Sequence, residues 1–319
     1  MKLFNLHDDL GKDIIERKKE SGLVSALVDI HLPKLQQGGF YCNAVACFFA
    51  GNETWNDMQE MILEANQQIE NSNANFLKNN TEIAEDNINL FITVEGMCGV
   101  NDDSTSVEDK IDWLADHNVI IASLCWNDQN YLATGLGCDD NYGLTAAGKR
   151  AIKQMEKRGI ILDVSHLNDK SFSEVIEIST ASIMATHSNT RALRNHGRNL
   201  TDKQLLAIAD KEGLVGLNAA RFIVSEDLSL QTIEQLAQHA KYIADLIGCD
   251  KVALGFDFMD YLAGYENSMI VGLENATVAQ NITKALQKVG FNHQEISAIC
   301  YQNCLKFFKK NFNITINNN

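Results

Sequence analysis

The chain contains 319 residues and carries a formal net charge of −15 at neutral pH. So acidic a chain repels a phosphate backbone, whose binding depends on clustered lysine and arginine, and nucleic acid is therefore not an expected partner. The sequence shows no secretory signal at its amino terminus and no run approaching the roughly 20 apolar residues that span a bilayer. We therefore expect a cytoplasmic protein without a membrane partner, whose eight cysteines stay reduced as small hydrophobic side chains.

Strand-like and helix-like segments alternate along the sequence, which is typical of βα units that build a parallel sheet. Short apolar runs predict the strands, and apolar residues at helical spacing predict the helices. In chain order we expect strands at 3–6 and 38–49, a helix at 55–79, a strand at 88–94, a helix at 106–118, a strand at 119–126, a helix at 143–159, a strand at 161–166, a helix at 168–180, a strand at 182–188, a helix at 201–213, a strand at 214–220, a helix at 228–248, a strand at 251–258, and helices at 277–290 and 293–311. Ser106 is expected to cap one helix, and Thr201 and Gln204 to form a capping box at another.

Side chains suited to metal binding follow five of the eight predicted strands. They are His7, Asp9, Glu95, His166, His187 and Asp257. Taken singly, each has an ordinary explanation: an exposed acidic cluster at His7 and Asp9, a rim or capping carboxylate at Glu95, and hydrogen-bonded core histidines at His166 and His187. His7 and Asp9 lie two positions apart, so both project to the same side of an extended strand. The shared position of all these residues at strand ends favours one common site.

The same distribution decides between two folds. Parallel βα units build either an open doubly wound sheet, with its site near one switch point, or a closed barrel, in which all strand ends meet. Side chains that follow five separate strands converge only around a closed ring. We therefore predict an α/β fold, a (β/α)8 TIM-type barrel. Because no proline-, serine- or glycine-rich linker divides the sequence, we expect one domain over residues 1–319, with a frayed tail near 313–319.

The residue types in this cluster indicate metal-dependent hydrolysis. Zinc takes imidazole and carboxylate ligands, and a site with this many donors has room for two ions that share a bridging carboxylate. Two such ions lower the pKa of a bound water toward about 7 and polarise a carbonyl group. The sequence thus predicts a hydrolase.

The remaining histidines and the cysteines show no metal-site spacing. Histidines in polar, helical or loop-like surroundings are expected at the surface, and these are His117, His239 and His293. His31, close to Pro33, is expected in a loop, while His196 follows the sixth strand closely enough to reach the barrel mouth. Cys300 and Cys304 share a helix face, and helix packing explains them better than a metal site.

The chain resembles the membrane (renal) dipeptidases, dinuclear zinc peptidases of the amidohydrolase-like barrel group. The resemblance covers nearly the whole chain and is carried by the segments LHDDL, TVEG, ILDVSH, ATHSNTRAL, HGRNLTD and GFDF. It implies a barrel enzyme that hydrolyses small dipeptides, including those with a D-residue at the carboxyl-terminal position, through a hydroxide that bridges two zinc ions. The family is commonly dimeric, so the resemblance also implies a homodimer.

The resemblance also implies a role for each matched residue. His7 and Asp9 would bind one zinc ion and His166 and His187 the other, with Glu95 bridging the two. Asp257 corresponds to the acid that handles the proton of the attacking water. Arg198 corresponds to the arginine that holds the terminal carboxylate of the substrate, a task that suits its planar, permanently charged group.

Two departures from the family pattern affect the wall of the substrate pocket. Where characterised members carry a histidine that contacts the scissile carbonyl, this chain has Trp126, whose indole donates one hydrogen bond and carries no charge. Where many members have Asn-Phe-Tyr after the seventh strand, this chain has Asn218, Ala219 and Ala220. Trp126 and Asn218 are therefore expected at the substrate, and Ala220 is expected to leave a tyrosine contact missing.

These departures leave alternatives open beside a zinc-dependent dipeptidase. One is a hydrolase of another small amide, such as an N-acyl amino acid, because the pocket wall differs while Arg198 still favours an anionic substrate. Another is a catalytically weak, metal-containing binding protein in which Trp126 marks lost activity. The ligands themselves are compatible with zinc, manganese or cobalt.

Overall fold

Eight parallel strands form a barrel in the computed structural model, which describes residues 1–316. The strands are β1 (Leu3–Asn5), β2 (Phe40–Phe48), β5 (Asn89–Glu95), β6 (Val119–Ser123), β7 (Ile161–Asp163), β8 (Ile183–Met184), β9 (Val215–Leu217) and β10 (Val252–Leu254). They pair in the order β8-β7-β6-β5-β2-β1-β10-β9, and a single parallel bridge between Ala185 and Val215 joins the two ends of that order. The predicted (β/α)8 barrel is confirmed, and each of the eight predicted strands contributes one strand to it.

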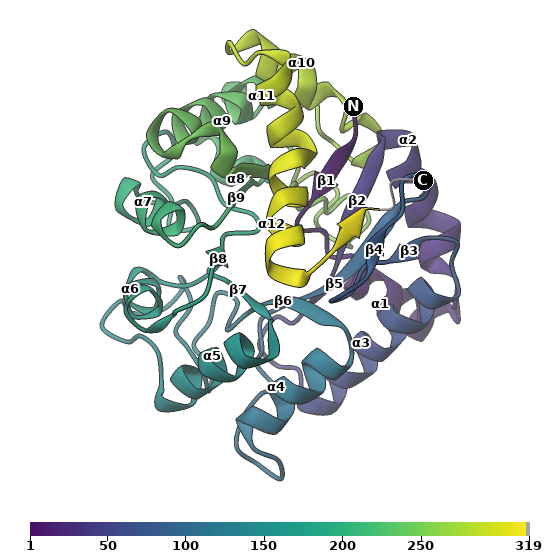
Figure 1. Cartoon of the computed structure of the whole chain (residues 1–319), viewed down its shortest axis with the longest axis vertical. Coiled ribbons are helices and arrows are strands. Elements are labelled where there is room, and N and C mark those ends of the chain that lie inside the picture. The colour runs from purple at the N-terminus through teal and green to yellow at the C-terminus, as the bar shows by residue number, and fades with distance from the viewer. Residues whose placement is uncertain (317–319) are drawn as a thin grey trace.

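Helices surround the barrel, as Figure 1 shows. They are α1 (Leu10–Ser21), α2 (Leu32–Gly38), α3 (Trp55–Glu70), α4 (Val107–Asp116), α5 (Ala146–Arg158), α6 (Asp169–Ile178), α7 (Asp202–Asp210), α8 (Arg221–Val224), α9 (Ile233–Ile247), α10 (Asn281–Lys288), α11 (His293–Ser297) and α12 (Asn303–Phe312). Their apolar faces and the outer faces of the strands share one continuous core. The predicted caps are confirmed, because Ser106 accepts from the Asp109 N–H and Thr201 forms a capping box with Gln204.

Helix α12 closes one end of the barrel (Figure 1). Phe308 of this helix packs edge-to-face against Phe4 of β1 and Phe91 of β5, with ring centroids 4.7 and 5.0 Å apart. These aromatic side chains belong to a second apolar cluster that fills the barrel near the amino-terminal ends of its strands. The barrel interior is therefore filled at this end, and the opposite end, where the strands finish, is the one that can hold a ligand site.

The structure differs from the sequence prediction in several segments. The helix predicted over 55–79 ends at Glu70, and the following residues form β3 (Asn75–Phe76), which pairs with β5. Helices α1 and α2 occupy a segment for which the apolar pattern predicts no element, because only the first half of α1 is buried and a π-helical turn, Leu27–His31, precedes α2. The strand predicted over 119–126 ends at Ser123, so Trp126 lies in the loop after β6.

Near the carboxyl terminus, β11 (Thr315–Ile316) pairs with β4 (Glu82–Ile83). Residues 313–319 are expected from the sequence to fray; the part of that tail up to residue 316 includes this short strand, and 317–319 lie outside the described residues. All eight cysteines are free thiols, and Cys300 and Cys304 are buried against the barrel as helix packing predicts. Within residues 1–316, no helix has both the length and the apolar character that a membrane crossing requires.

Candidate metal centre

The six predicted donors lie together at the open end of the barrel. Glu95 is the last residue of β5, and the others stand just beyond the ends of four more strands: His7 and Asp9 after β1, His166 after β7, His187 after β8 and Asp257 after β10. All except Asp257 are buried, and the side chain of Asp257 is only 13% exposed. The expectation that a closed ring brings these side chains into one place therefore holds.

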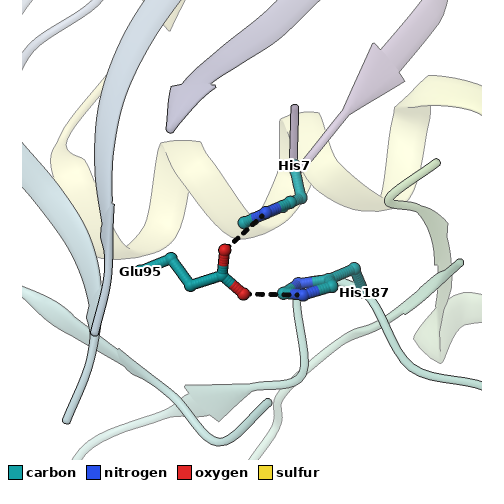
Figure 2. Close-up of side chains that lie close together, drawn as sticks. All are labelled: His7, Glu95 and His187. Carbon is teal, nitrogen blue, oxygen red and sulfur yellow. Dashed lines mark ion pairs between the residues drawn. The ribbon is translucent and has the colours of Figure 1, made fainter. Parts of the chain in front are cut away.

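Glu95 is the centre of the cluster. Figure 2 shows its carboxylate beside the rings of His7 and His187, with one oxygen directed at each. One oxygen, Oε1, lies 2.7 Å from His166 Nε2 and 3.1 Å from His187 Nε2, while Oε2 lies 3.4 Å from His7 Nε2. The two oxygens of one carboxylate thus face the histidine of β1 on one side and the two histidines of β7 and β8 on the other.

Two further contacts complete the half of the cluster next to β1. His7 Nε2 lies 3.3 Å from Asp9 Oδ1 and 3.9 Å from Asp257 Oδ1. Among the described residues, neither His7 Nε2 nor Asp9 Oδ1 has a hydrogen-bond partner, although both atoms are buried. A buried polar atom without a partner is costly. A cation bound between these atoms would satisfy both.

The donor geometry fits divalent cations. Ligand atoms of His7, Glu95 and His187 lie within 4.8 Å of one another, and so do those of His7, Asp9 and Asp257. The Nε2 atoms of His166 and His187 stand 3.1 Å apart, and both point at the same Glu95 oxygen. Imidazole nitrogens and carboxylate oxygens in this number are the donors that zinc and similar divalent metals take.

Burial and the neighbouring charges together shift the pKa values of the cluster residues. Burial lowers the pKa of His7, but Glu95 and Asp9 outweigh burial and hold this pKa well above its usual value. Burial raises the pKa of Glu95, yet His7 and His166 hold it well below its usual range. Burial, reinforced by Glu95, raises the pKa of Asp9 to about 6. Positive charge at His7 is thus favoured by the surrounding carboxylates, and a metal cation placed there meets the same attraction.

The two histidines of the other half are held neutral. Burial, together with the positive charge of Arg198, lowers the pKa of His166 to about 4. Burial, followed by the charge on His7, holds the pKa of His187 well below its usual value. A neutral imidazole keeps a lone pair on one ring nitrogen, which is the form that binds a metal.

Two residues of the centre have unusual backbone conformations. His166 and Asp257 have φ angles of 70° and 59°, in the left-handed region. Aspartate, asparagine and histidine enter this region more readily than most residues, and such conformations gather at functional sites. The strand-to-loop turn at each position aims the side chain at the cluster instead of continuing the strand.

Hydrogen bonds on the far side of each ring orient the histidines of β7 and β8. Asn127 Oδ1 lies 2.8 Å from His166 Nδ1 and accepts a hydrogen bond from it. Thr186 Oγ1 lies 2.7 Å from His187 Nδ1 and 2.5 Å from Asp163 Oδ2, so the imidazole donates to the hydroxyl and the hydroxyl donates to the carboxylate. Both contacts place the proton on Nδ1 and leave Nε2 free to face Glu95.

The segment that carries His187 lies unusually deep inside the ring. A Cβ atom at Gly216 or Gly255 would stand 1.9 or 1.8 Å from the carbonyl oxygen of Thr186. Only glycine fits at such an approach, and these two residues allow β9 and β10 to close over the end of β8. The depth of this segment brings His187 within reach of Glu95.

We expect Thr186→Val to weaken metal binding by about 10- to 100-fold, the usual effect of losing a group that orients a metal-binding histidine. Valine keeps the shape of threonine but removes the hydroxyl between His187 and Asp163. Thr186→Ser keeps the hydroxyl and should restore most of the affinity. Competition with a chelator measures the affinity directly, without any assay of turnover.

Thr93 provides a matched control for this substitution. Its hydroxyl is also buried in the barrel, but it has no hydrogen-bond partner within the described part of the chain. Thr93→Val should therefore leave metal affinity within about twofold, since no orienting contact is lost. Equal weakening by Thr93→Val and Thr186→Val would contradict the orienting role of Thr186.

A cavity of about 350 Å³ opens beside the cluster at the barrel mouth. Arg198 lines it and is 94% buried, donating to the carbonyl of His187 at 2.8 Å and to Ser188 Oγ at 3.0 Å. Burial lowers the pKa of Arg198. No carboxylate of the described residues forms an ion pair with it, so this buried guanidinium remains available to a bound anion.

Of the other three predicted wall residues, the structure places two at the cavity and one away from it. Trp126 and Asn218 line the cavity, and Asn218 Nδ2 also donates to Asp257 Oδ2 at 3.0 Å. Ala220 is fully buried and does not belong to the cavity lining, so the expectation that it shapes the wall is wrong. The chain bends into α8 after Ala220, and Phe222 reaches the cavity instead.

Several lining residues were missed by the sequence analysis. They lie at or beyond strand ends, and they include Phe48 at the end of β2, Phe222 in the short helix α8, and the loop residues Asn127, Leu136, Met259, Leu262 and Tyr265. The available signal was their position shortly after a predicted strand. His196, expected to reach the mouth, does line the cavity.

Two of the remaining histidines were misplaced by the sequence analysis. His31 lies in a helical turn, not a loop, and is buried with Nε2 2.8 Å from Asp13 Oδ2. His239, expected at the surface, is fully buried in α9 and contacts the Val224 carbonyl at 2.9 Å. Both rings are satisfied by partners that come from other elements, so neither is available to the metal centre.

A (β/α)8 barrel with histidines and carboxylates gathered at the carboxyl ends of its strands is the architecture of a metal-dependent hydrolase. The model of the membrane dipeptidase family, peptidase family M19, matches residues 1–318. The chain therefore belongs to this family, as the resemblance of its motifs implies.

Individual relatives match this chain at low sequence identity and over part of its length. An uncharacterized protein of Klebsiella pneumoniae, encoded in the pqqA 5' region, is 32% identical over 193 residues, which are 58% of this chain and 69% of that protein. Dipeptidase tcpJ of Claviceps purpurea is 25% identical over 170 residues, which are 53% of this chain and only 39% of the relative.

Solved structures share the fold over nearly the whole length. A metallopeptidase from Rhodobacter sphaeroides, bound to a phosphinate mimic of the dipeptide L-Ala-D-Ala, has a TM-score of 0.83 at 21% identity and covers 98% of this chain and 99% of its own. An amidohydrolase from Pseudomonas aeruginosa has a TM-score of 0.74 at 19% identity, covering 88% of this chain and 92% of its own. At such identities the likeness shows the fold alone.

Proposed function

We propose that this protein is a metal-dependent dipeptidase that cleaves the peptide bond of small dipeptides. The observation that carries the proposal is one cavity that joins the histidine and carboxylate cluster to the buried guanidinium of Arg198, which forms no ion pair with a carboxylate of residues 1–316. A dipeptide has a carbonyl to be attacked and, a few bonds away, a free carboxylate to be held. Membership of the dipeptidase family supports the same reaction.

The two halves of the cluster indicate the metal ligands. His7 and Asp9 would hold one ion and His166 and His187 the other, and one oxygen of Glu95 faces each half. We propose zinc at both positions, with manganese or cobalt compatible with the same donors. When bound, two such metal ions supply an activated water and polarise the carbonyl of the substrate.

The protein residues around the cluster supply positioning and proton transfer. Asp257 faces the cluster through Oδ1 while Asn218 holds its other oxygen, so its carboxylate is aimed to take the proton of the attacking water and deliver it to the leaving amine. Arg198 is fixed by two hydrogen bonds and binds the terminal carboxylate of the substrate. The indole of Trp126 adds one N–H donor to the cavity wall.

A second candidate substrate is an N-acyl amino acid. It also presents a carboxylate to Arg198, and no acidic side chain of the described lining, apart from the cluster itself, is available for a free amino group. The one-domain organisation, homodimer and cytoplasmic location expected from the sequence remain parts of the proposal. A catalytically weak binding protein is the outcome if the centre binds metal but turns nothing over.

The proposal is tested by removing and restoring metal. The purified chain is stripped with a chelator, reloaded with zinc, manganese or cobalt, and assayed on dipeptides with L,L and L,D stereochemistry and on their N-acetylated and amidated analogues. We expect turnover only with metal and a large loss when the carboxyl terminus is amidated. Unreduced turnover of N-acetylated analogues would favour the second candidate, and absence of both bound metal and metal-dependent turnover would refute the proposal.

A further inference from the structure

The cavity has two apolar walls that stand apart from each other. The first wall consists of Phe48, Trp126 and Leu136, and the second of Phe222, Met259, Leu262 and Tyr265. The metal cluster and Arg198 line the same cavity. The two walls come from different parts of the barrel, and their places in the ring show what they can contact.

The first wall stands over the strand that carries Glu95. Phe48 ends β2 and Trp126 follows β6, and these are the two neighbours of β5 in the sheet. The rings of Phe48 and Trp126 pack edge-to-face with centroids 5.2 Å apart, and Trp126 lies 5.9 Å from the ring of His166. This wall is therefore fixed by aromatic packing directly beside the metal cluster.

The second wall follows β9 and β10. Phe222 lies in α8, immediately after β9, and packs against His196 with ring centroids 5.7 Å apart. Leu262 and Tyr265 come from the loop that follows β10 and Asp257. Phe222 and Tyr265 are 48% and 49% exposed, so this wall keeps large apolar surface open to a ligand.

The two walls come from separate parts of the ring. In the ring of eight strands, β9 is four places from β5 in either direction, because the order runs β5-β2-β1-β10-β9 one way and β5-β6-β7-β8-β9 the other. Strands four places apart in a ring of eight lie on opposite sides. Phe222 therefore stands opposite the strand that carries Glu95, while Leu262 and Tyr265 follow β10, three places from β5. A ligand at the cluster meets one apolar wall beside β5 and a second one beyond β9 and β10.

The cavity offers no partner for a charged side chain. Its carboxylates among the described residues are Asp9, Glu95 and Asp257, all part of the metal cluster. Among the described lining residues its one permanent cation is Arg198, which the terminal carboxylate of the substrate occupies in the proposed reaction. A charged side chain would lose its water on entering and gain no ion pair.

We propose that the preferred substrates are dipeptides with an apolar side chain on both residues, one placed against each wall. This inference rests on the proposed dipeptidase function and adds the class of side chain to it. An apolar side chain on either residue buries surface against aromatic groups, whereas glycine leaves one wall uncovered and a charged side chain is desolvated without compensation.

A matched substrate series tests the inference. The zinc-loaded protein is assayed on Leu-Phe, Gly-Phe, Leu-Gly, Gly-Gly, Asp-Phe and Leu-Lys. Each apolar side chain should raise kcat/KM by about tenfold or more over glycine, as filling a hydrophobic subsite usually does, and the charged dipeptides should rank with or below Gly-Gly. A Gly-Gly or charged dipeptide that matches Leu-Phe overturns the inference and leaves dipeptidase activity standing.

Two wall variants test whether each wall serves a different residue. Trp126→Ala should reduce the preference for an apolar side chain at one position of the dipeptide, and Phe222→Ala the preference at the other. Tyr131→Ala is the matched control, because Tyr131 is an aromatic residue outside the cavity that is 46% exposed, close to the 48% of Phe222. It should leave every ratio unchanged. Loss of preference at the same position in both wall variants overturns the two-wall arrangement.

Binding of phosphinate analogues separates this inference from the proposed function. Matched phosphinates of Leu-Phe, Gly-Gly and Asp-Phe are titrated by calorimetry into the zinc-loaded protein, where no turnover is required. We expect the doubly apolar analogue to bind about 100-fold more tightly than the Gly-Gly analogue, the product of two tenfold gains. Equal binding overturns the inference. Absence of turnover on every dipeptide refutes the proposed function, and the phosphinate order then decides the side-chain class alone.

Discussion

Replacing Glu95 with glutamine is expected to empty the metal centre and to lower turnover by about 10²- to 10⁴-fold. Glu95 is the only described residue that contacts all three cluster histidines, with Oε1 2.7 and 3.1 Å from two of them and Oε2 3.4 Å from the third. Removing one partner of a buried charged cluster typically costs about 3–5 kcal/mol, and each ~1.4 kcal/mol corresponds to a factor of ten. Glutamine keeps the volume but removes the negative charge that both halves share.

The result is measured as metal ions per chain after gel filtration and as kcat on a dipeptide. Glu64→Gln is the matched control, because Glu64 is also buried and pairs with Lys18 but lies on α3, outside the barrel mouth. That variant should retain metal and activity and lose only stability. If Glu95→Gln kept its metal and more than a tenth of the activity, Glu95 would not join the two halves.

The strand ends could be predicted from sequence because the apolar run of a strand and the polar residue that ends it are both local features. His166 and His187 each follow a short apolar run, and Glu95 ends one, so the boundary between strand and loop marks the residue. The closed ring then adds the long-range information, since it brings all carboxyl ends to one mouth. A two-residue strand such as β8 is too short to show a periodic pattern. Its position in the alternation of strands and helices was sufficient to predict it.

The pocket wall could not be predicted in the same way. Phe222, Leu262 and Tyr265 lie in segments with no fixed period, and their direction depends on how each loop returns to its next helix. Ala220 illustrates the error: its place in a family motif predicted a wall position, but the chain turns there and buries it. Side-chain direction in a loop is set by tertiary contacts, which a single sequence does not display.

The predicted positions of the two buried histidines were wrong for a related reason. Pro33 favours a loop at His31, and the helical, polar surroundings of His239 favour a surface position. In the structure, His31 finds the carboxylate of Asp13 and His239 the carbonyl of Val224, partners 18 and 15 residues away. A polar ring enters a core when a partner is already there. Such a partner comes from another element, and composition alone does not identify it.

Replacing Asp257 with asparagine is expected to lower kcat by about 10²- to 10⁴-fold, the usual contribution of a general acid or base, while the chain keeps its metal. Asparagine has the same shape, tolerates the left-handed φ of 59° as well as aspartate does, and can still accept the hydrogen bond of Asn218 through its carbonyl. What it lacks is the ability to take a proton from water. The change therefore separates proton transfer from metal binding and from folding.

A nearby aspartate outside the cavity provides the control for Asp257→Asn. Asp260 lies three residues further along the same loop and pairs with Lys34 at 2.7 Å, outside the lining of the cavity. Asp260→Asn should keep kcat within about twofold, as surface-type substitutions away from a site usually do. Metal content and the melting temperature are measured for both variants. Loss of metal together with kcat in Asp257→Asn would make Asp257 a ligand, because its Oδ1 already stands 3.9 Å from His7 Nε2. Unchanged kcat with full metal would instead remove Asp257 from the reaction and assign proton transfer to another group at the mouth.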